Sequence, residues 1–123
     1  MSFVYLSTED LIHLAGRLGV LDVRDMGLLD SAALRPQSIV YGVESYPLLP
    51  DKAAAMMESI VGNHPLVDGN KRLGWAAVVT FLALNDVYVD VPDDDAYHFV
   101  ISVAAGERRF LHIAEQLADW IEN

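Results

Sequence analysis

Apolar residues recur every three to four positions over most of the chain, which is the spacing of amphipathic helices. In the first such stretch, Ser7 and Asp10 are placed to cap a helix reciprocally, and apolar positions continue to Leu18. Gly19 is typical of the residue that follows a helix. The pattern therefore predicts a first helix from just after Ser7 to about Gly19, with a loop over residues 20–26.

A second and a third helix are predicted on either side of an irregular segment. The second covers residues 28–33 and must end before Pro36, because a residue that precedes proline avoids the helical conformation. Pro50 opens the third helix and Gly62 ends it. Residues 36–49 contain prolines, a glycine and two tyrosines, and are predicted to form a loop or flap. The core face of the third helix is predicted to consist of Ala53, Met56, Met57, Ile60 and Val61.

A fourth helix is predicted to begin near Asn70. Between residues 75 and 84 only Thr80 is polar, which predicts a helix that is buried on all its sides. The alternation of apolar and polar positions at residues 87–91 is typical of a strand, although the sequence offers no clear partner for it.

Two more helices are predicted towards the C-terminus. Pro92 opens the fifth, residues 93–95 are three aspartates that suit its cap and its dipole, and Gly106 ends it. An apolar stripe over residues 110–121 predicts the sixth. Together the patterns predict one all-α domain of about six helices over residues 1–123, with at most one short strand.

Composition excludes several classes of protein. Hydrophobic residues make up 53% of the 123 positions, enough for a core, and the absence of cysteine excludes disulfides and thiolate metal sites. The start of the sequence lacks the basic stretch of a signal peptide. The longest apolar run is about half the length that a membrane span requires. We therefore expect a soluble, cytoplasmic protein that makes no contact with a membrane.

The net charge argues against nucleic-acid binding. The chain has 18 acidic residues against 8 Lys and Arg, a formal net charge of −10. Affinity for a phosphate backbone comes from clustered basic residues, so no direct contact with nucleic acid is expected. The few cations include two adjacent pairs. Arg108 and Arg109 are interpreted as solvated surface, with contact to a groove or an acidic partner as the alternative, whereas Lys71 and Arg72 have a more unusual position.

Lys71 and Arg72 fall in the first turn of the predicted fourth helix, where the positive end of the helix dipole disfavours cations. A bound anion would resolve this conflict, because free backbone N–H groups, the dipole and both side chains would face it. Gly69 would let the backbone approach such an anion closely. The pattern predicts a phosphate site at this helix N-terminus.

Two residues just upstream add reactive groups to this site. His64 can take up a proton near neutral pH. Asp68 supplies one carboxylate, enough for a Mg²⁺ ion that is otherwise held by phosphate oxygens and water. Each residue alone is ordinary for a loop or a turn. Together they favour phosphoryl or nucleotidyl transfer, in which positioning and charge neutralisation supply most of the catalysis.

The segment HPLVDGNKR, residues 64–72, resembles the motif HPFx[D/E]GNGRxxR of the Fic superfamily. It is closer to the death-on-curing (Doc) toxin branch, in which lysine replaces the glycine after asparagine. The resemblance extends to nearly the whole chain through the flanking segments YLSTEDLIHLAG, GLLDSAALRPQ, DKAAAMMESIVGNHP and PDDDAYHFVISVAAGE.

The resemblance implies a helical Fic fold and a toxin that transfers phosphate from ATP to a threonine of elongation factor Tu, which stops translation. A cognate antitoxin would inhibit it by folding its C-terminal segment into a groove. The implied roles are proton abstraction from the target hydroxyl by His64, Mg²⁺ binding by Asp68, and phosphate binding by Gly69, Asn70, Lys71 and Arg72.

Several positions depart from the Fic pattern. Leu66 replaces a phenylalanine at what we interpret as a packing position. Gly74 lies inside a helix at a cost of roughly 1 kcal/mol relative to alanine. Trp75 stands where AMP-transferring members have a second arginine. With Lys71, this favours transfer of the γ-phosphate, with AMP transfer or an inactive binding module as the alternatives.

Overall fold

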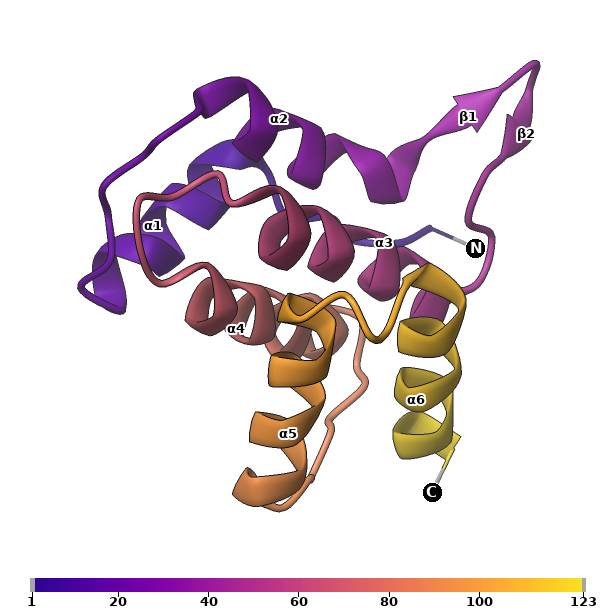
Figure 1. The fold of residues 1–123 in the computed structure, drawn as a ribbon. Coiled ribbons are helices and arrows are strands. Elements are labelled where there is room, and N and C mark those ends of the chain that lie inside the picture. The colour runs from indigo at the N-terminus through magenta and orange to yellow at the C-terminus, as the bar shows by residue number, and fades with distance from the viewer. Residues whose placement is uncertain (1, 123) are drawn as a thin grey trace.

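The structure is a computed structural model that describes residues 2–122, and within them it is mainly α-helical, as predicted. Figure 1 shows helices packed around a central helix, with a small hairpin that projects from them. The elements in chain order are α1 (Thr8–Arg17), α2 (Met26–Leu34), the 3₁₀ turn η1 (Arg35–Gln37), β1 (Ile39–Val40), β2 (Val43–Glu44), α3 (Leu49–Asn63), α4 (Asn70–Leu84), α5 (Asp93–Ala104) and α6 (Phe110–Glu122).

The first helix begins as its sequence predicts. The Ser7 hydroxyl accepts a hydrogen bond from the backbone N–H of Asp10, and the Asp10 carboxylate accepts one from the N–H of Ser7. Gly19 adopts a φ of 74° just after the helix, which confirms the predicted end. By contrast, the aspartates at residues 93–95 make no side-chain cap to α5. They lie in its first turn, where their negative charge still interacts favourably with the helix dipole.

The core is built around α3, which packs against α2, α4, α5 and α6 (Figure 1). Its predicted core face is confirmed, because Ala53, Met56, Met57, Ile60 and Val61 are all buried. Such burial stabilises a fold by about 1.5–3 kcal/mol for each large apolar side chain. The segment between α3 and α4 is therefore held at both ends by well-packed helices.

Gly74 of α4 lies directly against Val61 of α3. A Cβ atom at this position would come within 2.5 Å of the Cγ2 atom of Val61. The glycine thus permits a close helix contact, which accounts for its presence in a helix interior.

The prediction that α4 is buried on all sides is wrong. Leu84 is 46% exposed, and Trp75, Ala76 and Val79 are only partly buried. The neighbouring helices cover one face of α4, and part of the other face lines a groove described below. No helix among residues 2–122 is long and apolar enough to cross a membrane.

The strand expected at residues 87–91 is absent, and the only two strands in the described chain fall in the predicted loop instead. β1 and β2 pair antiparallel around a two-residue turn in which Tyr41 and Gly42 have φ values of 50° and 78°. Val87 and Val89 pack against the core from an extended segment, which explains their alternation without a sheet. The hairpin projects beside η1 (Figure 1).

Candidate active site

The segment of residues 64–72 joins the end of α3 to the start of α4. His64 is the C-cap of α3 and has the left-handed values φ 57° and ψ 60°. This conformation is uncommon for a residue other than glycine, and strained backbone of this kind is often found at functional sites. It turns the chain sharply out of α3 and leaves the His64 side chain exposed.

The His64 ring is oriented by a backbone carbonyl. Its Nδ1 atom lies 3.1 Å from the carbonyl oxygen of Gly62. Because that oxygen can only accept, Nδ1 carries the proton in the neutral ring and Nε2 keeps its lone pair. A histidine held in this tautomer can act as a base through Nε2.

Arg24 fixes the backbone on which His64 stands. Its Nε atom donates to the His64 carbonyl at 2.7 Å, and its Nη2 atom donates to the Asn63 carbonyl at 2.9 Å. These are carbonyls at the end of α3, where a cation is also favoured by the helix dipole. Sequence analysis missed this residue, because it lies 40 positions from His64 and no local pattern marks it.

The loop of residues 20–26 supports the site from one side. Asp22 accepts from the Val67 N–H at 2.8 Å, and the carbonyl of Pro65 accepts from the N–H groups of Arg24 and Asp25. Leu66 between them is 1% exposed, which confirms its packing role. The motif is thus held by backbone hydrogen bonds to a distant loop.

Asn70 has its side chain occupied inside the segment. Its Oδ1 atom accepts from the Leu66 N–H at 2.9 Å, and its Nδ2 atom donates to the Leu66 carbonyl at 3.0 Å. The residue is buried. A phosphate could therefore meet the backbone N–H of Asn70 while its amide closes the loop that precedes α4.

Gly69 is required by its surroundings. It has a φ of 83°, and a Cβ atom there would lie 2.5 Å from a methyl group of Val20. Gly69 is also the N-cap of α4 and provides no side chain to cap it. The first N–H groups of α4 are consequently left without a side-chain cap, which suits an anion.

Asp68 is exposed at the same turn. Its Oδ1 atom accepts from the Gly69 N–H at 2.8 Å, and no partner is seen for its second oxygen among the described residues. Nowhere in residues 2–122 do three or more His, Asp or Glu side chains gather in a way that could hold a metal. Asp68 therefore offers one exposed carboxylate oxygen at this turn.

Lys71 and Arg72 are both exposed in the first turn of α4, as predicted. Arg72 donates from Nη2 to the Leu18 carbonyl at 2.8 Å, so the end of α1 sets the direction of its guanidinium. His64, Asp68, Lys71 and Arg72 thus stand on one short connection. Of the residues that the sequence assigned to the site, His64, Asp68, Lys71 and Arg72 are exposed, whereas the Asn70 side chain is turned inwards.

A groove of about 540 Å³ runs from the two cations along α4 and α5. Trp75 lines it, with its ring edge-on to Phe99 and Trp120 at centroid distances of 6.2 and 6.1 Å. Apart from Lys71, Arg72 and Asp93, the side chains along it are apolar or aromatic, among them Leu18, Ala76, Tyr97, Val100 and Ile101.

Two comparisons place these observations among known proteins. A model of the Fic/DOC family matches residues 5–82, which include the whole of the segment between α3 and α4. The chain is also 49% identical over 119 residues to the protein named Toxin Doc from Mycolicibacterium smegmatis. That match covers 93% of this chain and 91% of the other protein.

Proposed function

The chain belongs to the Fic/DOC family, and on that premise we propose that it is the toxin of a toxin–antitoxin pair and an ATP-dependent protein phosphotransferase. The proposed acceptor is a threonine hydroxyl of elongation factor Tu, whose modification would stop translation in the cytoplasm. The observation that carries the proposal is an exposed histidine at the end of α3, a short connection before an uncapped helix N-terminus that bears two cations.

His64 is the base in this proposal. Its Nε2 atom takes the proton of the acceptor hydroxyl while the hydroxyl oxygen attacks the γ-phosphorus of ATP. The bond between the γ-phosphorus and the bridging oxygen breaks, and ADP leaves with that oxygen. The Gly62 carbonyl keeps the ring in the required tautomer and stabilises the imidazolium that forms.

The phosphates of ATP are held at the start of α4. The backbone N–H groups of residues 70 and 71 and the side chains of Lys71 and Arg72 supply the donors and the positive charge. Asp68 would hold Mg²⁺, which neutralises charge on the phosphates when it is bound. The Leu18 carbonyl holds the Arg72 guanidinium in place, so little ordering of this side chain is needed when ATP binds.

Transfer of the γ-phosphate is favoured over transfer of AMP by two side chains. Lys71 places a long cation where AMP-transferring members have glycine, and so fills space beside the phosphates. Trp75 cannot replace the second arginine of those members, because an indole carries no positive charge and has a single N–H donor; its ring packs against Phe99 and Trp120. The nucleotide therefore has its γ-phosphate nearest to His64.

The test uses ATP labelled at either the α- or the γ-phosphate, with purified elongation factor Tu and with cell lysate as acceptors. We expect label on protein from the γ position only, and loss of transfer by 10²–10⁴-fold in His64→Ala. His112→Ala, which removes another exposed histidine, serves as the matched control. Label from the α position alone would identify an AMP transferase, and the absence of both would point to a binding module.

The groove along α4 and α5 is the proposed binding site of the antitoxin. Its apolar lining and the cations at one end suit an amphipathic segment that carries an acidic residue near Lys71 and Arg72. Such a segment would be disordered alone and would fold on binding. Hydrogen exchange of the complex should show protection in α4 and α5, and protection confined to a distant face would contradict the assignment.

A further inference from the structure

A second hollow, of about 310 Å³, lies between α3 and the turn that joins α5 to α6. Its charged lining residues are Arg35, Glu58, Arg108 and Arg109. It shares no lining residue with the groove of Lys71 and Arg72. The hollow is thus a separate feature, and it contains the arginine pair that the proposed reaction does not use.

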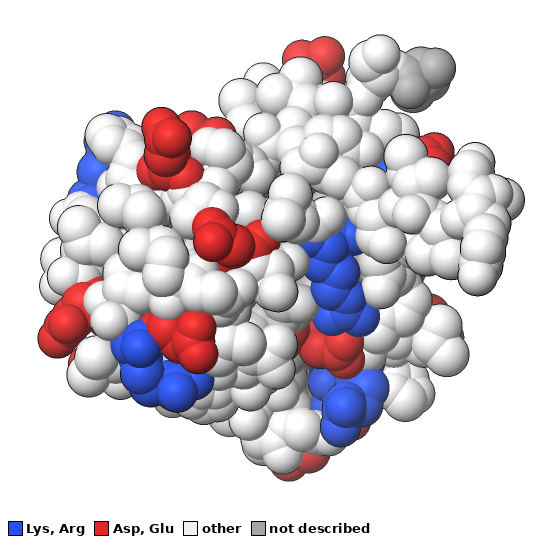
Figure 2. Space-filling view, turned by 90° about the horizontal axis from the view of Figure 1, so that it is seen from above, with Lys and Arg blue, Asp and Glu red and all other residues white. Residues whose placement is uncertain are grey.

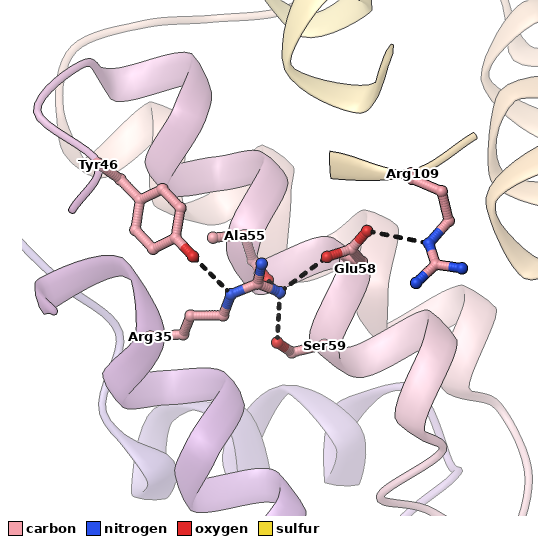
Figure 3. Close-up of polar contacts among 6 residues, drawn as sticks. All are labelled: Arg35, Tyr46, Ala55, Glu58, Ser59 and Arg109. Atoms are coloured by element: carbon pink, nitrogen blue, oxygen red, sulfur yellow. Dashed lines mark hydrogen bonds and ion pairs between the residues drawn. The ribbon is translucent and has the colours of Figure 1, made fainter. Parts of the chain in front are cut away.

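The floor of the hollow is an ion pair whose charges are already matched. Arg35 donates from Nη1 to Glu58 at 3.0 Å and to the Ser59 hydroxyl at 3.1 Å, and from Nε to the Tyr46 hydroxyl at 3.0 Å (Figure 3). Burial lowers the pKa of Arg35, but Tyr46 and Glu58 outweigh it and the net shift is upward. One oxygen of Glu58 is thereby occupied by Arg35.

Arg108 and Arg109 give the hollow an excess of positive charge, because Glu58 is the one carboxylate among its lining residues. The Arg109 side chain is 80% exposed, and its Nε atom lies 3.6 Å from the second Glu58 oxygen (Figure 3). Arg108 lies over the Phe99 ring at 5.5 Å, and no carboxylate pairs with it among residues 2–122. Two net positive charges therefore face one small hollow in a chain whose net charge is −10.

The hollow adjoins the proposed base. Gly62 and Asn63 line it, and the Gly62 carbonyl accepts the hydrogen bond from the His64 ring. Since the phosphates belong to the start of α4, a protein that brings its hydroxyl to His64 can lay its neighbouring residues across this hollow. We propose that Arg108 and Arg109 bind the carboxylate of an acidic side chain that flanks the acceptor hydroxyl of the protein substrate.

The acidity of the whole molecule favours a single carboxylate over an extended polyanion as the ligand of the two arginines. Figure 2 shows acidic atoms spread over one face, with basic atoms in a few small groups beside them. Such a surface repels extended polyanions, whereas a single acidic side chain meets only the local field of the two guanidinium groups. The assignment of the ligand to a substrate rests on the proposed function.

The experiment measures peptide binding by NMR with the whole chain and without ATP. The probe is a short peptide with one threonine flanked by glutamates, and its twin carries glutamines instead. We expect the glutamate peptide to bind roughly three- to tenfold more tightly, the range for one or two exposed charge pairs. The chemical-shift changes that this peptide causes in the protein should fall at residues 62–64 and 103–109.

Two charge reversals test the assignment. Arg108→Glu and Arg109→Glu should each abolish the preference for glutamate, whereas Arg17→Glu, the same change on exposed α1, should preserve it. The proposal would be overturned if the two peptides bound equally well, or if the chemical-shift changes fell at residues 70–76 instead. It would also be overturned if Arg17→Glu lost the preference for glutamate to the same extent. Because no phosphate is transferred in this assay, its outcome is independent of the labelling experiment.

Discussion

At the scale of single residues, the site depends on contacts made by the backbone of His64 as much as on its ring. The left-handed conformation of this residue is held by Arg24, which binds its carbonyl and that of Asn63. The sequence identified His64 because its motif is local. It could not identify Arg24, because a contact between residues 40 positions apart depends on how the whole chain folds.

Arg24→Ala should lower kcat for phosphate transfer by roughly ten- to a hundredfold, the range for a displaced catalytic group. The KM for ATP should change little, because the start of α4 is untouched. Loss of the two charge-assisted hydrogen bonds should cost about 1–2 kcal/mol of stability. Arg24→Lys should recover part of kcat, since one ammonium can still reach a carbonyl.

Arg17→Ala is the matched control, because Arg17 is an exposed arginine on α1. If Arg24→Ala lost stability but kept the parent kcat, Arg24 would be a structural residue with no influence on the base.

Asp68→Ala should remove most of the Mg²⁺ dependence of ATP binding, because its carboxylate is the one protein ligand proposed for the ion. Titration calorimetry with and without Mg²⁺ measures this dependence. Asp90→Ala removes an exposed carboxylate outside the site and should leave it intact. A metal dependence that survives in Asp68→Ala would show that the ion is held elsewhere.

At the scale of elements, the spacing of apolar residues was enough to predict the helices but not the hairpin. Each helix repeats its apolar spacing over nine or more residues, whereas β1 and β2 have two residues each and cannot display an alternation. Val87 and Val89 alternate for another reason, since an extended chain that lies on a core also buries every second side chain. The exposed side of α4 was not predicted, because the apolar side chains that line a groove cannot be told from core side chains by their sequence pattern.

Gly74→Ala should destabilise the fold although alanine is the better helix former. The gain in propensity is about 1 kcal/mol, but the new Cβ would come within 2.5 Å of Val61, a buried and stiff side chain. Overpacking of this kind typically costs 1–3 kcal/mol, so we expect a net loss of up to about 2 kcal/mol in urea unfolding.

Two further variants isolate the contact between α3 and α4. Adding Val61→Ala to Gly74→Ala should restore part of the loss, which a double-mutant cycle would measure. Gly62→Ala has open space for its Cβ and should stabilise α3 instead. A Gly74→Ala variant as stable as the parent would mean that the two helices can move apart freely.

At the scale of the whole molecule, one buried lysine joins the hairpin to the helices and to the N-terminal segment. Lys52 is 1% exposed and donates from Nζ to the Pro36 carbonyl at 3.1 Å and to Glu44 at 3.0 Å. Its ammonium also lies 5.2 and 5.3 Å from the ring centroids of Phe3 and Tyr5. An ordinary amphipathic helix pattern gives no sign of such a residue.

This lysine predicts a specific loss of stability at alkaline pH. Burial lowers the pKa of Lys52, but Tyr5 and Glu44 outweigh it, and the net shift is upward from the ordinary 10.5. A raised pKa in the folded state means that the contribution of Lys52 is fully present below pH 10.5 and is lost as the pH rises through the folded value.

The free energy of unfolding, measured with urea between pH 8 and pH 12, should therefore fall more steeply with rising pH for the parent than for Lys52→Met. Lys71→Met, which removes the other lysine of the chain, an exposed one, should decline as the parent does. Equal slopes for the parent and Lys52→Met would contradict the raised pKa.

The hairpin has a base that is bound to the helices and a tip on which the fold does not depend. Its base is bound to the helices through Lys52 and through the hydrogen bond between Arg35 and Tyr46. Its tip, with Tyr41 fully exposed, carries no share of the core. Mutations at the tip should therefore accumulate with little penalty in folding, whereas mutations at the base should not.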